Sequence, residues 1–456
     1  MSVLVDRSVP RTLFSMAYPM LAGTFAMNAY NLVDTWFIAK LGTLPLAAMG
    51  FIFPVVMLVT CIAGGIGTGI TTLVSHAIGR QDHPDATRFV THGLILVISV
   101  TIIISVFGRL LMVPTFSQLG ADNEILDLIA EYMNIWYFGA VFMAMPMLGN
   151  GILISVGDSK AASWFMILGT VINTILDPIM IFGFFGCPVM GIRGAALATV
   201  IAQSISTVCL LYLLCRKHHL LSWVAGRFNV FFKTLCQITH FAIPSILSMI
   251  LMPISNSIIT KILSFFGNEA VAACGVASRI ESFAFMIPMA VGMSLTPFVS
   301  QNFGAGCMNR VREAQRITKW FALGYGGFIA LVFFFSSSLM ASVFSDDPKV
   351  AVILVHYIQI ISFGYGMMEV HRYCGFFLTG MQKPVSTTIL NAIRIIVLLI
   401  PLSYLGAHFW GITGVFSCRL ISDIISGSIG LVWVSQIIHT TITPVKGISL
   451  LCPKKL

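Results

Sequence analysis

Twelve apolar runs, each long enough to cross a lipid bilayer, occupy most of this sequence. A membrane-spanning helix needs about 20 apolar residues, and in hydrocarbon only helices and closed barrels satisfy every backbone N–H and C=O group. Runs of this length exceed a barrel strand, so each one predicts a helix. The runs cover residues 13–38, 46–75, 89–113, 126–155, 161–185, 194–215, 238–264, 271–299, 318–344, 350–379, 385–406 and 411–438.

The charged residues agree with an all-α membrane protein of twelve transmembrane helices. Only 9% of the 456 residues are charged, whereas soluble domains are about one-quarter charged. The net charge of +9 could suggest a nucleic-acid partner, but the basic residues lie mostly in short loops between the apolar runs, as membrane orientation requires. If the N-terminus is cytoplasmic, 17 of the 26 basic residues fall on the inside and 5 on the outside, with four within helices. Since cytoplasmic loops carry the excess of Lys and Arg, we expect both termini in the cytoplasm.

The chain repeats itself with an offset of 225 residues. Pro19 matches Pro244, and Gly42 matches Gly267. Later, Gly191-Ile192-Arg193-Gly194 resembles Gly411-Ile412-Thr413-Gly414. Because six helices are an even number, the two copies must share one orientation, as parallel repeats do. We expect two parallel six-helix lobes, 1–215 and 238–456, around a central cavity, joined by a cytoplasmic linker at 216–237.

Asp34 is a lone charge in the first apolar run. An ionised carboxylate in hydrocarbon costs about 2.5–3.5 kcal/mol or more, so it should face a bundle interior or a watery cavity. Asp177, in the fifth run, is the best candidate partner. Asp34 aligns with Ile259 in the second copy, and a residue that only builds the fold would tend to appear in both copies. We therefore interpret both acids as functional rather than structural.

Oxygen-bearing residues accompany these acids. Asn173 lies four residues before Asp177 and shares its helix face. Thr199 in the sixth run offers a hydroxyl, and Asn31 in the first run is a candidate for the cavity wall. Carboxylate, amide and hydroxyl oxygens suit a hard cation such as sodium, and a buried carboxylate can equally take up a proton. No P-loop is present, so we expect transport driven by an ion gradient, with no cofactor.

The second lobe has its own buried polar residues, which we interpret as secondary or cavity-lining. Glu281 is expected to pair with Arg279, and Glu369 with Arg372. An Arg419–Asp423 pair at i,i+4 is also expected. A further residue of this kind, His371, is either a hydrogen-bonded core histidine or a proton relay.

The sequence resembles the multidrug and toxic compound extrusion (MATE) family along its whole length. The stretches that carry the resemblance are Asn31–Phe37, Gly42–Gly50, Asn173–Pro178, Gly194–Thr199 and Pro297–Gly306. The family exports cationic, often aromatic compounds in exchange for protons or sodium ions.

Within the family, the sequence is similar to the DNA-damage-inducible-F-like branch, whose coupling acids lie on the first and fifth helices. The resemblance assigns the ion site to Asp34, Asn173, Asp177 and Thr199. Another branch uses acids on the seventh and tenth helices, and here only Glu369 lies near such a position.

These observations predict a monomeric ion-coupled antiporter, not an enzyme, that exports amphipathic organic cations across a bacterial inner membrane. The ion enters the acidic site, and alternation between inward-open and outward-open states couples it to export. One alternative is a flippase for a lipid-linked substrate. Another is a membrane scaffold or sensor that transports nothing.

The charge asymmetry makes a topology prediction. Reporter fusions at the N-terminus, within 216–237 and at the C-terminus should all report a cytoplasmic location. A fusion between the first two runs, after Lys40, serves as the periplasmic control. A periplasmic signal from 216–237 would contradict the arrangement of two parallel lobes.

Overall fold

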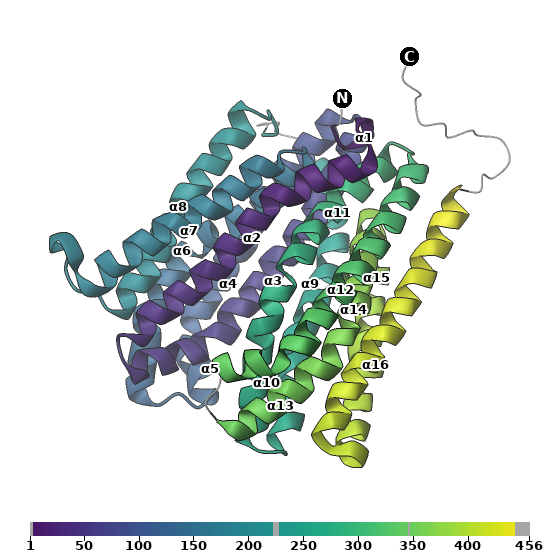
Figure 1. The fold of residues 1–456 in the computed structure, drawn as a ribbon. Helices are drawn as coiled ribbons and strands as arrows, with labels where there is room; N and C mark the ends of the chain where they lie inside the picture. Colours follow the sequence, from purple (N-terminus) through teal and green to yellow (C-terminus); the bar gives the residue numbers. More distant parts are fainter. Residues whose placement is uncertain (1–2, 222–227, 345–346, 443–456) are drawn as a thin grey trace. The chain divides into compact units, whose positions relative to one another are not determined.

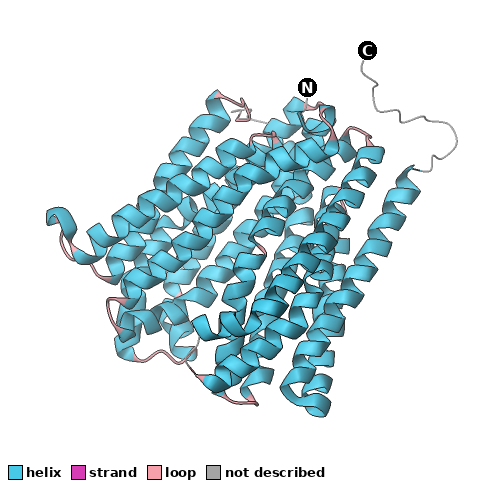
Figure 2. Ribbon diagram, viewed as in Figure 1, coloured by secondary structure: helices cyan, strands magenta, loops and turns pink. Residues whose placement is uncertain are grey.

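A computed structural model describes residues 3–221, 228–344 and 347–442. Figure 2 shows that these residues form helices joined by loops and turns, with no strand among them. They fold into two compact units, one of residues 15–221 with 228–246 and one of residues 3–14 with 247–344 and 347–442. Each unit is described by itself below.

The first unit contains six long helices and several short elements (Figure 1). They are α2 (Val9–Ala39), α3 (Thr43–Gly79), α4 (His83–Leu110), α5 (Met112–Gln118), α6 (Asn123–Ser155), α7 (Ser159–Phe182), the 3₁₀ turn η1 (Phe184–Gly186) and α8 (Ile192–Arg216). The helix α6 is central, because it packs against α3, α4, α7 and α8. Its buried side chains include Met133, Trp136 and Tyr137.

The second unit also holds six spans, several of which are interrupted. Its elements are α1 (Val3–Asp6), α9 (Phe228–Ser264), α10 (Asn268–Ala284), α11 (Met286–Gly304), α12 (Met308–Phe344), α13 (Pro348–Ile361), η2 (Ser362–Gly364), α14 (Tyr365–Gly380), α15 (Pro384–Ala392), the π-helix η3 (Ile393–Leu399) and α16 (Ile400–Ile442). Here α14 is central and packs against α11, α12 and α16. The chain passes from one unit to the other within α2 and within α9.

All twelve predicted spans are helical. Nine helical stretches of the described residues are each long and apolar enough to cross a membrane, and α10 with α11 forms a tenth that is bent by 58°. The helix α2 supplies the first predicted span, and a break at Gly411 divides the stretch Pro384–Thr441 into the last two. Large apolar side chains point outward, among them Phe138, 83% exposed, and Phe335, 82% exposed. Such surface suits lipid rather than water.

Aspartate caps begin several helices of the first unit. The side chains of Asp82, Asp122 and Asp158 accept hydrogen bonds from backbone N–H groups in the first turns of α4, α6 and α7, at 3.1, 2.9 and 3.1 Å. An N-cap of this kind satisfies one of the free N–H groups at a helix start. The short polar connections between the apolar runs thus supply the residue that caps the N-terminus of the next helix.

The sequence prediction of one continuous span over 271–299 is wrong in detail, because this span is broken at Phe285. Pro288 has no N–H to donate to the carbonyl of Ala284, four residues earlier. The Tyr325 hydroxyl donates to that carbonyl instead, at 2.8 Å. The Tyr373 hydroxyl donates to the carbonyl of Pro288 at 2.9 Å, so neighbouring helices hold the bend on both sides.

The internal repeat is visible in the backbone as well as in the sequence. Gly191 has φ 56° and ψ −132°, and its counterpart Gly411 has φ 60° and ψ −145°. Both values lie where L-residues with a Cβ are strained and glycine is not. The two copies therefore share an uncommon turn at the same place, just before the last helix of each unit.

Candidate functional site

Three helices of the first unit bring the predicted site residues together. Asn173 and Asp177 lie on α7, and Thr199 lies on α8. The Asn173 Nδ2 group donates to Thr199 Oγ1 at 3.1 Å and is 3.4 Å from Asp177 Oδ1. Asp34, on α2, is half-buried, and its charge interacts with that of Asp177. The four residues thus form one polar cluster inside an apolar unit, which we call the Asp34–Asp177 cluster.

The cluster is sealed from the surroundings on its α7 and α8 sides. Asn173 and Thr199 are each 2% exposed, and Asp177 has no exposed surface. No described Lys or Arg forms an ion pair with Asp34 or Asp177. An acid kept in such surroundings without a basic partner is expensive, so its retention indicates a role beyond packing.

Two buried oxygens of the cluster lack hydrogen-bond donors. Within the described residues no donor reaches Asp177 Oδ2 or Asn173 Oδ1. A buried acceptor without a donor costs about 1–3 kcal/mol, and more when it is charged. Both atoms are acceptors and both are hard oxygens, so a proton on the carboxylate or a hard cation beside it would satisfy them.

Two tyrosines, which were not predicted from the sequence, also belong to the cluster. The Tyr30 hydroxyl lies beside Thr199 and in the electrostatic field of both acids. Tyr132 on α6, which is buried, lies in the field of the same acids and of Tyr30. Tyr30 could have been found, because it precedes Asp34 by four residues and so shares its helix face. Tyr132 has no such signal, since it is far from the other residues in sequence.

A close contact between α7 and α8 sets the distance from Asn173 to Thr199. A Cβ placed on Gly194, near the start of α8, would lie 2.5 Å from the carbonyl oxygen of Met180 on α7. Only glycine permits this approach. On the other side of α7, Ser163 Oγ donates to the carbonyl of Pro19 and ties α7 to α2. The Gly194 contact thus brings α8 against α7, and the Ser163 hydrogen bond links α7 to α2 nearer the start of α7.

The cluster offers oxygen ligands from acid, amide and hydroxyl side chains. Across the described chain, no three His, Cys, Asp or Glu side chains gather in a way that could hold a metal ion. The donors present are carboxylate, amide and hydroxyl oxygens, which suit weakly held sodium or a proton. Asn31 lies in α2, and its side chain is outside the part of the chain that the structure describes.

In the second unit, Glu281 has a different partner from the one that the sequence predicted. Glu281 accepts from Arg419 Nη2 through both carboxylate oxygens, at 2.9 Å each. Tyr357 and Tyr365 donate to the same carboxylate, at 2.9 and 3.2 Å. The predicted Arg279–Glu281 pair is wrong because residues two apart point to different sides of a helix, and Arg279 is exposed.

The predicted Arg419–Asp423 pair is also wrong. Asp423 pairs instead with Arg394, whose Nε and Nη2 groups lie 2.8 and 2.7 Å from Oδ1. Arg394 is the second residue of the π-helix η3. A π-turn rotates the side chains that follow it relative to a regular α-helix, and such turns are frequent at functional sites. Arg394 is therefore the partner of Asp423, and Glu281 is the partner of Arg419, in place of the predicted Arg419–Asp423 pair.

The remaining acid of these spans behaves as predicted. Glu369 pairs with Arg372 at 2.9 Å in an i,i+3 arrangement, which confirms that prediction. His371 is buried, and its Nε2 atom lies 3.0 Å from Asn391 Oδ1. Glu281, Glu369 and Asp423 of the second unit are therefore all matched by arginines, in contrast to Asp34 and Asp177 of the first unit.

Two repeated six-helix units, one of which holds acids without a basic partner among the described residues, define a membrane transporter built from parallel repeats. The chain belongs to the MatE family, whose model matches residues 19–179 and 244–405. The two matched blocks begin 225 residues apart, at the offset that the sequence repeat predicts. The family comprises transporters and not enzymes.

Several known proteins are similar to this chain over most of its length. A protein of Shewanella oneidensis named FAD transporter is 34% identical over 93% of this chain and 94% of its own length. The probable multidrug resistance protein YoeA of Bacillus subtilis is 26% identical over 78% of each chain. The crystal structure of the Vibrio cholerae MATE transporter VcmN in the bent form is 31% identical, with a TM-score of 0.88, and covers 95% of this chain and 98% of that chain.

The contact at Gly194 makes the first prediction from this site. Gly194→Ala should push α8 away from α7, destabilise the protein by about 1–3 kcal/mol through overpacking, and impair transport by separating Thr199 from Asn173. The measurement is the unfolding temperature in detergent together with transport in vesicles. The control is Gly275→Ala, where the new Cβ meets nothing within 4 Å. Equal unfolding temperatures for the two variants would contradict the close contact.

The Glu281–Arg419 pair makes the second prediction. Arg419→Ala leaves Glu281 buried without a basic partner and should cost about 3–5 kcal/mol of stability. The matched control is Arg279→Ala, which removes an exposed arginine from the same helix as Glu281. Thermal unfolding of the purified variants measures both. If Arg279→Ala proved as destabilising as Arg419→Ala, the assignment of the partner to Arg419 would be wrong.

Proposed function

We propose that this chain is an ion-coupled antiporter that exports amphipathic organic compounds, and that Asp34 and Asp177 take up the coupling ion. The observation that carries this proposal is the pair of buried oxygens, Asp177 Oδ2 and Asn173 Oδ1, which have no donor within the described residues. They lie in an acidic cluster without a basic partner. A site built in this way gains most from an added positive charge.

The two acids act as one unit in this proposal. Their charges repel each other and Asp177 is fully buried, so both cannot be ionised cheaply at once. Binding of a proton or a sodium ion neutralises the cluster and removes the repulsion between α2 and α7. The helix α2 contains Pro19, where it can bend, and it repacks against its neighbours when the repulsion is gone. The ion thereby favours one of two conformations.

Both coupling ions remain candidates, and they use different atoms. A proton needs only a carboxylate oxygen of Asp34 or Asp177. Sodium also needs neutral oxygens, which Asn173 Oδ1 and Thr199 Oγ1 would supply. The second-unit residues Glu281, Glu369 and His371 have secondary roles in this proposal, since arginine or amide partners already occupy them.

For the substrate, we propose small amphipathic organic cations, which an acidic site attracts and an incoming ion displaces. The similarity to a multidrug resistance protein supports this class. A second candidate is a flavin dinucleotide, supported by the 34% identity with the protein named FAD transporter. The two candidates differ in charge, because a dinucleotide carries an anionic pyrophosphate.

The proposal includes the organisation of the chain in its membrane. We propose a monomer in a bacterial inner membrane, with lobes 1–215 and 238–456, a cytoplasmic linker at 216–237 and both termini in the cytoplasm. The excess of basic residues on one side supports this orientation.

Transport by purified protein in lipid vesicles tests the function. An imposed pH or sodium gradient should drive uptake of a fluorescent organic cation, of FAD, or of both, in separate assays. Movement of neither compound under either gradient would overturn the antiporter proposal. A flippase would instead move a lipid-linked substrate, and a scaffold would move nothing.

The coupling acids make a specific prediction. Asp34→Asn and Asp177→Asn should each abolish gradient-driven transport while leaving the amount of folded protein near that of the wild type. If the acids form one unit, the double variant should be little worse than either single variant, because neighbouring residues in one network are non-additive. The matched control is Asp127→Asn, which changes an exposed aspartate on α6 and should have no effect.

The same variants identify the ion. If sodium is the ion, it should raise the unfolding temperature of the wild type, and Asn173→Ala should weaken that shift. If the proton is the ion, sodium should leave the unfolding temperature unchanged in both. Strictly additive losses from the two Asp variants would mean that the acids act at separate sites.

A further inference from the structure

The first turns of α12 carry three basic side chains on one side of the helix. Val311, Ala314 and Thr318 are buried and fix the inner face. Arg312, Arg316 and Lys319 follow a spacing of four and three residues, so they lie along a common outer stripe. Like charges at this spacing repel one another, so the stripe is unfavourable unless an anion faces it.

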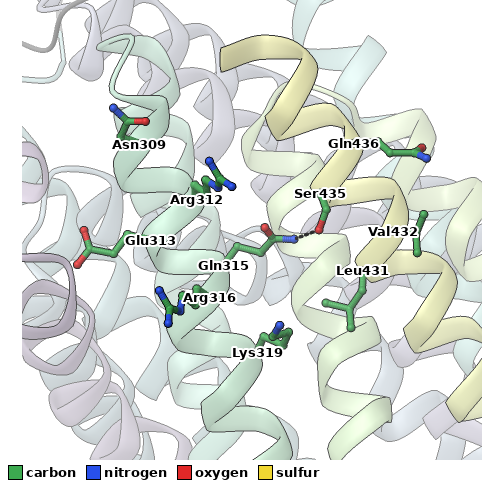
Figure 3. Close-up of a pocket in the computed structure, with 10 residues that line it drawn as sticks. All are labelled: Asn309, Arg312, Glu313, Gln315, Arg316, Lys319, Leu431, Val432, Ser435 and Gln436. Atoms are coloured by element: carbon green, nitrogen blue, oxygen red, sulfur yellow. Dashed lines mark hydrogen bonds between the residues drawn. The ribbon is translucent and has the colours of Figure 1, made fainter. Parts of the chain in front are cut away.

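A pocket of about 690 Å³ lies between this stripe and the last turns of α16, both in the second unit. Figure 3 shows Arg312, Arg316 and Lys319 along α12, with Ser435 and Leu431 opposite them on α16. A hydrogen bond from Gln315 to Ser435 Oγ, at 3.0 Å, bridges the two helices. The pocket therefore has a fixed frame on both sides. We call it the α12–α16 pocket.

The basic groups of the pocket, Arg312, Arg316 and Lys319, form no salt bridge with other described residues. Glu313, the acid among the lining residues, points away from α16 in Figure 3. The lining thus carries three basic side chains against one acidic one, which favours an anionic ligand.

The position of the pocket along α12 matches the headgroup level of a membrane. Lys319 is the last charged residue of α12, and its Nζ atom lies 5.0 Å from the ring centroid of Trp320, which is 61% exposed. Beyond it the outward side chains are apolar, such as Phe328 and Leu331. Exposed Trp next to Lys marks the boundary between hydrocarbon and water. On α16, Val432 is 58% exposed and offers apolar surface beside the charges.

From this geometry we propose that the α12–α16 pocket binds the headgroup of an anionic phospholipid, in the leaflet on the side where α12 begins. The phosphate lies among Arg312, Arg316 and Lys319, and the acyl chains continue along the apolar surface below Trp320. Basic pockets between transmembrane helices bind such headgroups, and guanidinium groups match phosphate oxygens in geometry. The ligand would join α12 to α16 in the second unit.

Charge also argues against the chain itself as the occupant. The sequence after α16, residues 443–456, contains three lysines and no acidic side chain. A basic segment does not complement a basic pocket. A soluble phosphate compound shares the headgroup chemistry but has no acyl chains, and the experiment separates it from a lipid.

Native mass spectrometry of the full chain in detergent tests the proposal. The protein is titrated with phosphatidylglycerol, with zwitterionic phosphatidylcholine, and with soluble glycerol phosphate. The wild type should retain phosphatidylglycerol in preference to the other two. The variant with Arg312→Gln, Arg316→Gln and Lys319→Gln should bind phosphatidylglycerol on the order of 100-fold more weakly, since each basic side chain near an anionic lipid contributes about fivefold.

A matched control removes the same amount of charge elsewhere. Lys261→Gln, Lys349→Gln and Lys383→Gln together neutralise three exposed lysines of the second unit and should leave phosphatidylglycerol binding unchanged. Equal retention by the pocket variant and the control would overturn the proposal. So would binding of glycerol phosphate as tightly as of phosphatidylglycerol, because the site would then recognise a soluble anion.

Discussion

A backbone amide has no water to bond with inside a bilayer, and this constraint governs the whole molecule. It makes every span a helix, and it demands a substitute wherever a helix is interrupted. At the bend between α10 and α11, Pro288 cannot donate to Ala284, and the Tyr325 hydroxyl takes its place. Where such a helix is broken, side chains of neighbouring helices therefore form the hydrogen bonds that the backbone has lost. These breaks are candidates for the hinges about which the helices move.

Charge inside the bilayer is the second constraint, and the two units meet it differently. In the second unit the acids of the spans are matched by arginines, as in the Glu281–Arg419 and Asp423–Arg394 pairs. A matched pair holds helices in place and has little to gain from an added ion. In the first unit, no Lys or Arg of the described residues forms an ion pair with Asp34 or Asp177. Such an arrangement is less stable, and a positive ion can relieve it, which is the property that a coupling site requires.

The internal duplication makes this difference informative. The two copies retain the same turn at Gly191 and Gly411, and each has a central helix, α6 or α14. The scaffold is thus shared, whereas position 34 is acidic and its counterpart, residue 259, is isoleucine. Features present in both copies are those that the fold requires. A charge present in only one copy is not required by the fold, which favours a functional role for it.

The sequence by itself determined the helical class, the twelve spans and the repeat, because hydrophobic length and backbone satisfaction are local properties that need no knowledge of contacts. It also identified Asp34, Asn173, Asp177 and Thr199 as a group. Only the tertiary structure decided which charges pair. Proximity in sequence suggested Arg279 for Glu281 and Asp423 for Arg419, yet Arg419 binds both carboxylate oxygens of Glu281, which is 138 positions away. The position of Tyr132 in the cluster and the contact between α12 and α16 have the same origin. Side chains of distant helices are brought together by packing, and the spacing of residues along one helix does not reveal which helices pack together.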